Sequence, residues 1–139
     1  MKIVNARIRL ETKGNGDLLD ISREVSRVVK ESGLQTGNVL VFVIGSTAGI
    51  TTFEYEPGLT ADIKEMYEKI APSGRHYYHD DTWGDANGFS HVRASLTGPS
   101  LTVPFEKGKL LLGTWQQIVL AEFDNRPRKR EIVVQILGE

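Results

Sequence analysis

The longest uninterrupted apolar run of this 139-residue chain is VLVFVI, at residues 39–44. Six residues are too few for a helix of ordinary length, and the run is rich in β-branched side chains. It therefore predicts a strand that is buried on both faces. The run is also far shorter than the roughly 20 apolar residues of a membrane-spanning helix. We expect a domain built around this strand, with no membrane partner.

The segment before this run predicts a strand followed by a helix. Residues 3–10 alternate apolar and polar side chains, which is typical of a half-buried strand. Asp17 is the expected N-cap of a helix that ends near Gly33. The apolar residues that recur at helical spacing are Leu18, Ile21, Val25, Val28 and Val29.

The segment after the run predicts a second main helix and several strands. A strand is expected at residues 50–55, and a helix follows from about Pro57 until Pro72 ends it. Further along, the pattern predicts a short helix at 91–96 and strands at 101–105, 110–112, 115–123 and 131–137. Because strands dominate, we expect one α+β domain over residues 1–139, a mainly antiparallel sheet with two main helices packed on it.

The charge and cysteine content exclude several classes of function. There are 17 basic and 18 acidic side chains, so a diffuse basic field for nucleic acid is absent and no nucleic-acid partner is expected. The chain has no cysteine, which excludes disulfides, thiol nucleophiles and cysteine-ligated metals. The first residues alternate in polarity and do not resemble a targeting segment, so we expect a cytoplasmic protein.

The three histidines of the chain, His76, His79 and His91, lie within sixteen residues of one another. They share residues 73–91 with several aspartates, glycines and aromatic side chains. One interpretation is a polar pocket for an anion or a metal, in which carboxylates orient the imidazoles. The other is a solvated loop in which Asp, Asn and Gly form turns. The spacing leaves both open.

Two further groups of polar residues have a functional and a structural interpretation. Residues 45–49 (GSTAG) follow the buried strand, so their backbone N–H groups and hydroxyls could hold a phosphate, although a glycine-built strand bend is favoured. The second group consists of charged side chains. Glu54 and Glu56 are either acid–base groups or solvated carboxylates. The basic run either binds phosphate or is a solvated loop, and its residues are Arg126, Arg128, Lys129 and Arg130.

Several segments together resemble the secondary thiamine-phosphate synthase family. Residues 108–118 (GKLLLGTWQQI) are the most specific match. The segments HVRASLTGPS at 91–100 and EFDNRPR at 122–128 support it, as do Pro72, residues 78–80 (YHD) and residues 85–87 (DAN). The resemblance covers essentially the whole chain.

The resemblance implies a small trimeric enzyme with a weak, secondary ability to join a thiazole phosphate to a pyrimidine diphosphate, releasing pyrophosphate. The expected partners are a small phosphorylated molecule and two further copies of the chain. The family pattern pairs His79 and His91 with a third histidine in a metal- or anion-binding pocket. In this chain Gly45 stands at that third position. A divalent metal, Zn or Mg, is an expected cofactor with His79 and His91 as ligands. Because Gly45 replaces the third histidine, one of the three expected ligands is missing.

The mechanism that follows gives each residue a role. His79, His91 and Asp85 are the expected catalytic residues: the imidazoles lie near the diphosphate, and Asp85 orients one of them or holds a cation. The expected substrate- and anion-binding residues are Ser46, Thr47, Trp115 and Gln116. The alternative function is a non-enzymatic binding protein for a phosphorylated or anionic metabolite. An adaptor protein is least favoured, because no exposed apolar patch is recognisable in the sequence.

Overall fold

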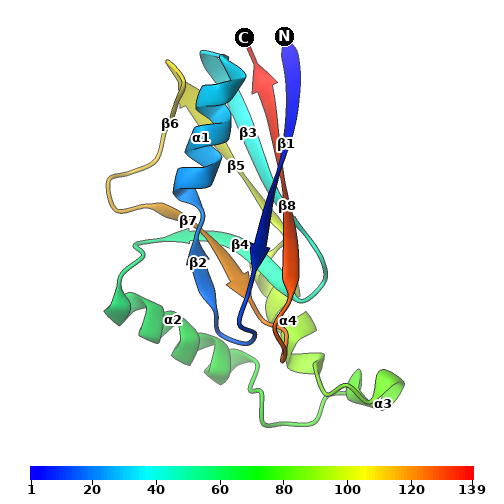
Figure 1. Cartoon of the computed structure of the whole chain (residues 1–139). Helices are drawn as coiled ribbons and strands as arrows, with labels where there is room; N and C mark the ends of the chain where they lie inside the picture. Colours follow the sequence, from blue (N-terminus) through cyan, green and yellow to red (C-terminus); the bar gives the residue numbers. More distant parts are fainter.

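Two antiparallel sheets carry the fold, and the computed structural model describes all 139 residues (Figure 1). The five-stranded sheet has the order β1 (Lys2–Glu11), β8 (Lys129–Gly138), β3 (Thr36–Ile44), β5 (Ser100–Glu106), β6 (Lys109–Leu110). The three-stranded sheet has the order β2 (Leu18–Asp20), β7 (Gln117–Glu122), β4 (Ala48–Phe53). Every strand pair is antiparallel, which confirms the α+β prediction.

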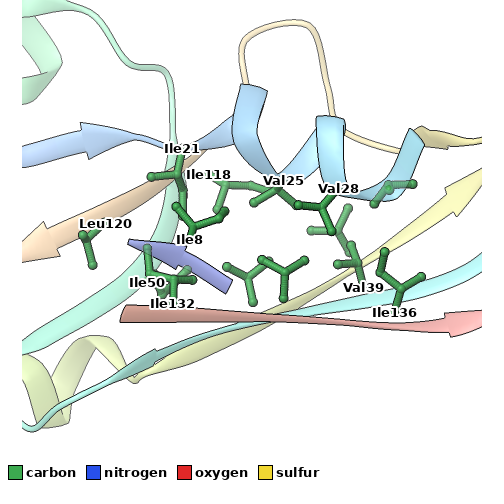
Figure 2. Packing of buried hydrophobic residues seen from close by; sticks show 14 of the residues in the cluster. Ile8, Ile21, Val25, Val28, Val39, Ile50, Ile118, Leu120, Ile132 and Ile136 are labelled. Atoms are coloured by element: carbon green, nitrogen blue, oxygen red, sulfur yellow. The ribbon is translucent and has the colours of Figure 1, made fainter. Parts of the chain in front are cut away.

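Four helices accompany the sheets. They are α1 (Ser22–Ser32), α2 (Pro57–Ile70), α3 (Asp80–Trp83) and α4 (Gly88–Thr97). Helix α1 covers one face of the five-stranded sheet, where Val25 and Val28 face side chains of β3 and β8 (Figure 2). Helices α2 and α4 contribute Tyr67 and Ala94 to a smaller apolar cluster against the three-stranded sheet. Helix α3 lies within the polar segment at residues 73–91, and α4 begins near the end of that segment.

The central strand β3 is buried on one face only, so the prediction of a strand buried on both faces is wrong. Val39, Val41 and Val43 are fully buried beneath α1. Phe42 and Ile44 are 37% and 46% exposed. Side chains alternate across a strand, and only one face of this sheet carries a helix.

The uncovered face of the five-stranded sheet is partly apolar. Phe42 and Ile44 lie there, and Ile3 pairs with Leu137 on the neighbouring strands β1 and β8. All four side chains are exposed. These side chains come from three strands that are far apart in the chain, so the sequence alone does not show that they share a face. No helix in the structure is both long enough and apolar enough to cross a membrane.

The first main helix begins later than its apolar spacing predicts. Residues Leu18–Asp20 form β2, and the helix begins at Ser22 with Ile21 as its N-cap. Leu18 pairs with Ala121 of β7, so the sheet provides hydrogen-bond partners that outweigh the helical pattern. Asp17 does not cap the helix, because its carboxylate accepts from the backbone N–H of Lys13.

The second main helix confirms its predicted bounds. Helix α2 begins at Pro57, and Glu56 caps it, because its carboxylate accepts from the N–H groups of Gly58 and Leu59. The helix ends at Ile70, before Pro72. Glu56 is therefore a helix cap, which is the structural interpretation of that carboxylate.

Candidate functional site

The structure brings His79 and His91 together. His79 immediately precedes α3, and His91 lies in the first turns of α4. Their ring centroids are 4.3 Å apart, with the ring planes inclined by 52°. The two histidines that the sequence selected thus form one pair, although twelve residues separate them in the chain.

Asp80 holds the two helices in this arrangement. Its carboxylate accepts from the backbone N–H groups of Tyr77 and Gly88, both at 2.9 Å. These hydrogen bonds, that of Tyr77 foremost, lower the pKa of Asp80 because they favour its charged form. A Cβ atom at Gly88 would lie 2.4 Å from the Cβ of Tyr77, so only glycine permits this close approach.

His91 lies in an environment that favours its neutral form. Burial lowers the pKa of the His91 imidazole, and the neighbouring His79 lowers it further. The carboxylates of Asp124 and Asp85 act in the opposite direction. A neutral imidazole keeps a free lone pair, which can accept a proton or ligate a metal.

Asp124 is held rigidly at the end of β7. The hydroxyl of Thr47 donates to its carboxylate at 3.1 Å, and the N–H of Asn125 donates to it at 2.8 Å. The Arg128 guanidinium lies 3.4 Å from the same carboxylate. The backbone N–H of Phe123 donates to the Thr47 carbonyl, which fixes the turn at residues 45–47 beside this strand end.

A buried ion pair lies behind Asp124. The Arg130 guanidinium donates to both oxygens of the Glu122 carboxylate, and the two side chains are 2% and 0% exposed. Thr12 donates to Glu122 at 2.6 Å, and Arg130 donates to the Thr47 hydroxyl at 2.7 Å. Thr47 therefore accepts from Arg130 while donating to Asp124, and it links the ion pair to the site.

Gly45 leaves space that Arg130 occupies. A Cβ at Gly45 would lie 2.7 Å from Nη1 of Arg130, and the backbone there has φ of +144°. A larger residue would displace the end of the guanidinium and strain the backbone. No imidazole stands at this position, so the pair His79–His91 has no third histidine beside it.

Two buried polar atoms at the start of α4 have no hydrogen-bond partner. They are Oγ of Ser90, whose residue is fully buried, and Oδ1 of Asn87. Asn87 precedes Ser90 by three residues and His91 by four, so these side chains share the first turn of the helix. Buried polar groups are normally satisfied, so these atoms indicate a place for a water molecule or a ligand group.

The remaining predicted site residues divide into two groups. Asp85 is exposed, and its carbonyl accepts from the Asn125 side chain, which ties its loop to the end of β7. Ser46 is exposed beside the same strand end, and Thr47 is 4% exposed with its hydroxyl already engaged. These residues gather near His91.

Trp115 and Gln116 lie at the opposite end of β7. Both precede Gln117, the first residue of that strand, whereas Asp124 follows its last. Six residues of strand separate the two ends by roughly 20 Å. Trp115 is 71% exposed, and Gln116 contacts Thr52. Within one chain these two residues do not line the histidine site.

The other polar candidates have structural roles. His76 is exposed, and its imidazole lies 3.1 Å from Asp81 and 3.9 Å from Asp80. Within the basic run, Arg130 is buried in its ion pair and Arg128 contacts Asp124. Arg126 and Lys129 are exposed.

A metal ion would find an incomplete ligand set in one chain. His79 and His91 would supply two nitrogen ligands, but no group of three or more His, Cys, Asp or Glu side chains in the chain has ligand geometry. Zinc prefers four ligands, and magnesium prefers oxygen ligands. The divalent cofactor therefore stays a prediction.

Sequence reasoning missed Asp124, Ser90 and Asn87. Asp124 carries a recognisable signal, since it and Glu122 are acidic residues at the end of an apolar strand pattern, where a charge requires a partner. Ser90 and Asn87 are ordinary polar residues in the sequence. Only the burial and the missing hydrogen bonds single them out.

Comparisons with known proteins agree on one family. The model of the family described as "UPF0047 protein YjbQ-like" matches residues 6–139. A UPF0047 protein of Archaeoglobus fulgidus is 41% identical over 94% of this chain and 98% of its own. YugU of Bacillus subtilis, also a UPF0047 protein, is 32% identical over 94% of this chain and 97% of its own.

Solved structures give the same result. A crystal structure of a protein of unknown function from Sulfolobus solfataricus superposes with a TM-score of 0.92 and is 34% identical, over 99% of both chains. A protein of the yjbq/upf0047 family from Clostridium acetobutylicum gives a TM-score of 0.85 at 37% identity, over 95% of this chain and 99% of that one.

These matches correct the expected family and its activity. Their names are UPF0047 or YjbQ, or state an unknown function, and none of these relatives is named a thiamine-phosphate synthase. The prediction of a secondary thiamine-phosphate synthase, with the function drawn from it, is therefore wrong.

Proposed function

The chain belongs to the YjbQ-like UPF0047 family, and we propose that its His79–His91 pair is an acid–base site for a small phosphorylated molecule. In this proposal the neutral His91 accepts a proton from a hydroxyl group or a water molecule bound beside it. His79 provides the adjoining imidazole, and Asp124 stabilises the positive charge that His91 acquires.

The observation that carries the proposal is the 4.3 Å separation of the two imidazole rings together with the lowered pKa of His91. A general base works best when its pKa lies near the working pH, because it is then largely free of its proton and still basic enough to accept one. Asp124 is 2% exposed and is held by Thr47, so its carboxylate keeps a fixed orientation. Perturbed pKa values of this kind cluster at functional sites.

The phosphorylated ligand is supported by donors around the pair. The Arg128 side chain is one-third exposed, so its guanidinium can reach a phosphate while it contacts Asp124. The Ser90 hydroxyl is buried without a partner, and it lies in the first turn of α4, where the helix dipole favours an anion.

The test compares His91→Gln with His76→Gln, because His76 is an exposed histidine outside the pair. Binding of inorganic phosphate and of p-nitrophenyl phosphate is followed by calorimetry, and release of p-nitrophenol is followed by absorbance. We expect the His76→Gln protein to behave as wild type. The His91→Gln protein should lose proton transfer, lowering turnover by about a hundredfold or more.

Two results would contradict this function. One is wild-type binding and turnover in His91→Gln. The other is an absence of phosphate binding together with a His91 pKa at or above 6.5 in an NMR titration, because the neutral imidazole is the basis of the proposal.

A divalent metal ion is the second candidate ligand of the same pair, favoured by the closeness of the two imidazoles. Zinc fits nitrogen ligands better than magnesium does. Titration with zinc chloride should then show one ion bound per chain, lost in His79→Gln and retained in His76→Gln. Equal binding by both variants would remove this candidate.

The uncovered sheet face supports self-association, and we propose a homotrimer assembled through it. Exposed apolar side chains on that face include Phe42 and Ile44, and such patches mark interaction sites. Light scattering should give three times the 15.5 kDa chain mass, and a Phe42→Glu, Ile44→Glu protein should give the mass of one chain. An unchanged mass in that variant would exclude this face.

The proposed ligand also implies a location. Phosphorylated metabolites are the substrates of cytoplasmic chemistry, so we place the protein in the cytoplasm. Fractionation of cells that express it should recover the protein with cytoplasmic enzymes, and recovery in a membrane or secreted fraction would contradict this placement.

A further inference from the structure

An open, shallow hollow lies between α1 and β6, and these two elements are at the other end of the molecule from α3 and α4 (Figure 1). Its volume is about 710 Å³. The lining residues are Ser22, Arg23, Ser26, Arg27, Lys30, Lys109, Leu110 and Leu112. We call this hollow the α1–β6 groove. None of the predicted site residues lines it.

The charge of the groove is one-sided. Four of its eight lining residues are cationic and none is acidic, in a chain with a net charge of −1. Arg27 is neutralised by a two-point hydrogen bond to Glu31 at 2.9 and 3.0 Å. Arg23, Lys30 and Lys109 form no ion pair. The groove therefore keeps three uncompensated positive charges, which attract an anion with more than one charge.

The spacing of these charges defines the shape of the anion. Arg23, Arg27 and Lys30 recur every four or three residues, so they lie in a row on one face of α1. Arg23 and Lys30 are seven residues apart, which is about 10 Å along a helix. A row of this length suits a chain of linked phosphates better than a single phosphate. Lys109 adds a charge from β6.

The groove also offers hydroxyl and apolar contacts. Ser26 is exposed on α1, and its hydroxyl makes no hydrogen bond within the protein. Leu110 and Leu112 are half-buried and provide apolar surface beside the cations. A ligand that combines linked phosphates with a flat apolar ring would use both kinds of contact.

A second hollow on the surface also contains several cationic side chains, so the presence of cations alone does not single out the α1–β6 groove. That hollow is beside β1 and β8, has a volume of about 470 Å³, and is lined by Arg9, Lys129 and Arg130 together with Glu11 and Glu131. Arg9 pairs with Glu131, and Arg130 is buried in its own ion pair. Two of its three cations are therefore paired and two carboxylates line it, whereas three of the four cations of the α1–β6 groove are unpaired and no carboxylate lines that groove.

We propose that the α1–β6 groove is a second ligand site that binds a nucleotide carrying two or more linked phosphates. The phosphates lie along Arg23, Lys30 and Lys109, and the base lies against Leu110 and Leu112. This site is separate from the histidine pair and does not depend on the function proposed there.

The test uses ATP, inorganic tripolyphosphate and adenosine as probes in calorimetry with the full chain. ATP should bind more tightly than tripolyphosphate, and adenosine should bind weakly. The affinity of the Arg23→Gln, Lys30→Gln protein for ATP should fall at least about tenfold, because two charge-assisted contacts are lost. The matched control is Lys2→Gln, Lys64→Gln, which removes two exposed charges outside the groove and should retain wild-type affinity.

Four outcomes would overturn the proposal. The first is no ATP binding by the wild-type protein, and the second is an equal loss of affinity in the control variant. The third is loss of ATP binding in His91→Gln, which would place the nucleotide at the histidine pair. The fourth is tighter binding of a single-stranded oligonucleotide than of ATP with the same dependence on Arg23 and Lys30, which would make the groove a nucleic-acid site.

Discussion

At the scale of single residues, Thr47 has the most connected side chain of the site. Its one hydroxyl accepts from Arg130 and donates to Asp124. A residue of the same shape without the hydroxyl would leave a buried donor and a buried acceptor each short of a partner. The energetic cost of such a change comes mainly from these unpaired groups.

We expect Thr47→Val to lower the free energy of unfolding by about 1–3 kcal/mol. Thr51→Val, in the adjoining strand β4, is the control, because the Thr51 hydroxyl makes no hydrogen bond in the structure; it should cost less than about 0.5 kcal/mol. Urea unfolding measures both. Equal stability of the two variants would show that the Thr47 hydroxyl is not needed.

The His91 imidazole offers a second test at this scale. Replacement of His79 by Gln removes a neighbouring positive charge, so the pKa of His91 should rise. Asp124→Asn removes a negative charge, so that pKa should fall. NMR titration of the His91 ring protons measures both shifts, with His76→Gln as the unchanged reference. Shifts in the reverse directions would contradict the geometry of the pair.

At the scale of elements, the site depends on how closely α4 approaches the turn before α3. The Asp80 carboxylate joins the backbone of Tyr77 to that of Gly88, and Gly88 packs so closely against Tyr77 that a side chain would not fit between them. The separation of the two imidazole rings is a consequence of this contact between elements.

Gly88→Ala should therefore push α4 away from the turn. The added Cβ would lie 2.4 Å from that of Tyr77, and such overpacking costs about 1–3 kcal/mol. Gly74→Ala is the matched control, because a Cβ there meets nothing within 4 Å. Thermal unfolding measures stability, and the His91 pKa reports the ring contact. An unperturbed His91 pKa in Gly88→Ala would contradict this role of the contact.

The elements also show how far a sequence alone can predict this molecule. Helix α2 and strand β1 were predictable because the signals of proline and of alternating apolar residues act locally. Residues 18–20 were not, since their pairing with β7 depends on a strand about a hundred positions away. Composition pointed to the cluster of three histidines, and the resemblance singled out His79 and His91 within it. The contribution of Asp124 was not, because its partner Thr47 is 77 residues distant.

At the scale of the whole molecule, the ion pair Glu122–Arg130 connects the two sheets. Glu122 ends β7 of the three-stranded sheet, and Arg130 lies in β8 of the five-stranded sheet. Both side chains are fully buried, so each is stable there only with the other present.

Arg130→Met should lower the free energy of unfolding by about 3–5 kcal/mol, because it leaves Glu122 charged and unpaired. The double variant Arg130→Met, Glu122→Leu should recover much of this loss, since neither of the two positions then carries a buried charge. Guanidinium unfolding of the two proteins measures the difference. A double variant as unstable as the single one would show that packing, and not charge, dominates at this position.

The stability of the whole chain should fall in two pH windows. The unfolded chain binds a proton on His91 near pH 6.5, but the folded chain does so only at lower pH, so acidification below 6.5 favours unfolding. The lowered pKa values of Glu68 and Asp80 add losses only below about pH 4.5 and 3.8, their ordinary values. His91→Gln should abolish the first window alone. A persistent loss near pH 6 in that variant would assign it to another group.

The position of β8 has a consequence for how the protein is made. Strand β8 is synthesised after every other strand, yet it lies between β1 and β3 and pairs with both along most of its length (Figure 1). Until β8 leaves the ribosome, β1 has no strand partner and β3 has one unpaired edge. Unpaired edges of this kind favour association with other chains. The five-stranded sheet, and with it the partner of Glu122, is therefore completed only after all the other strands have been synthesised.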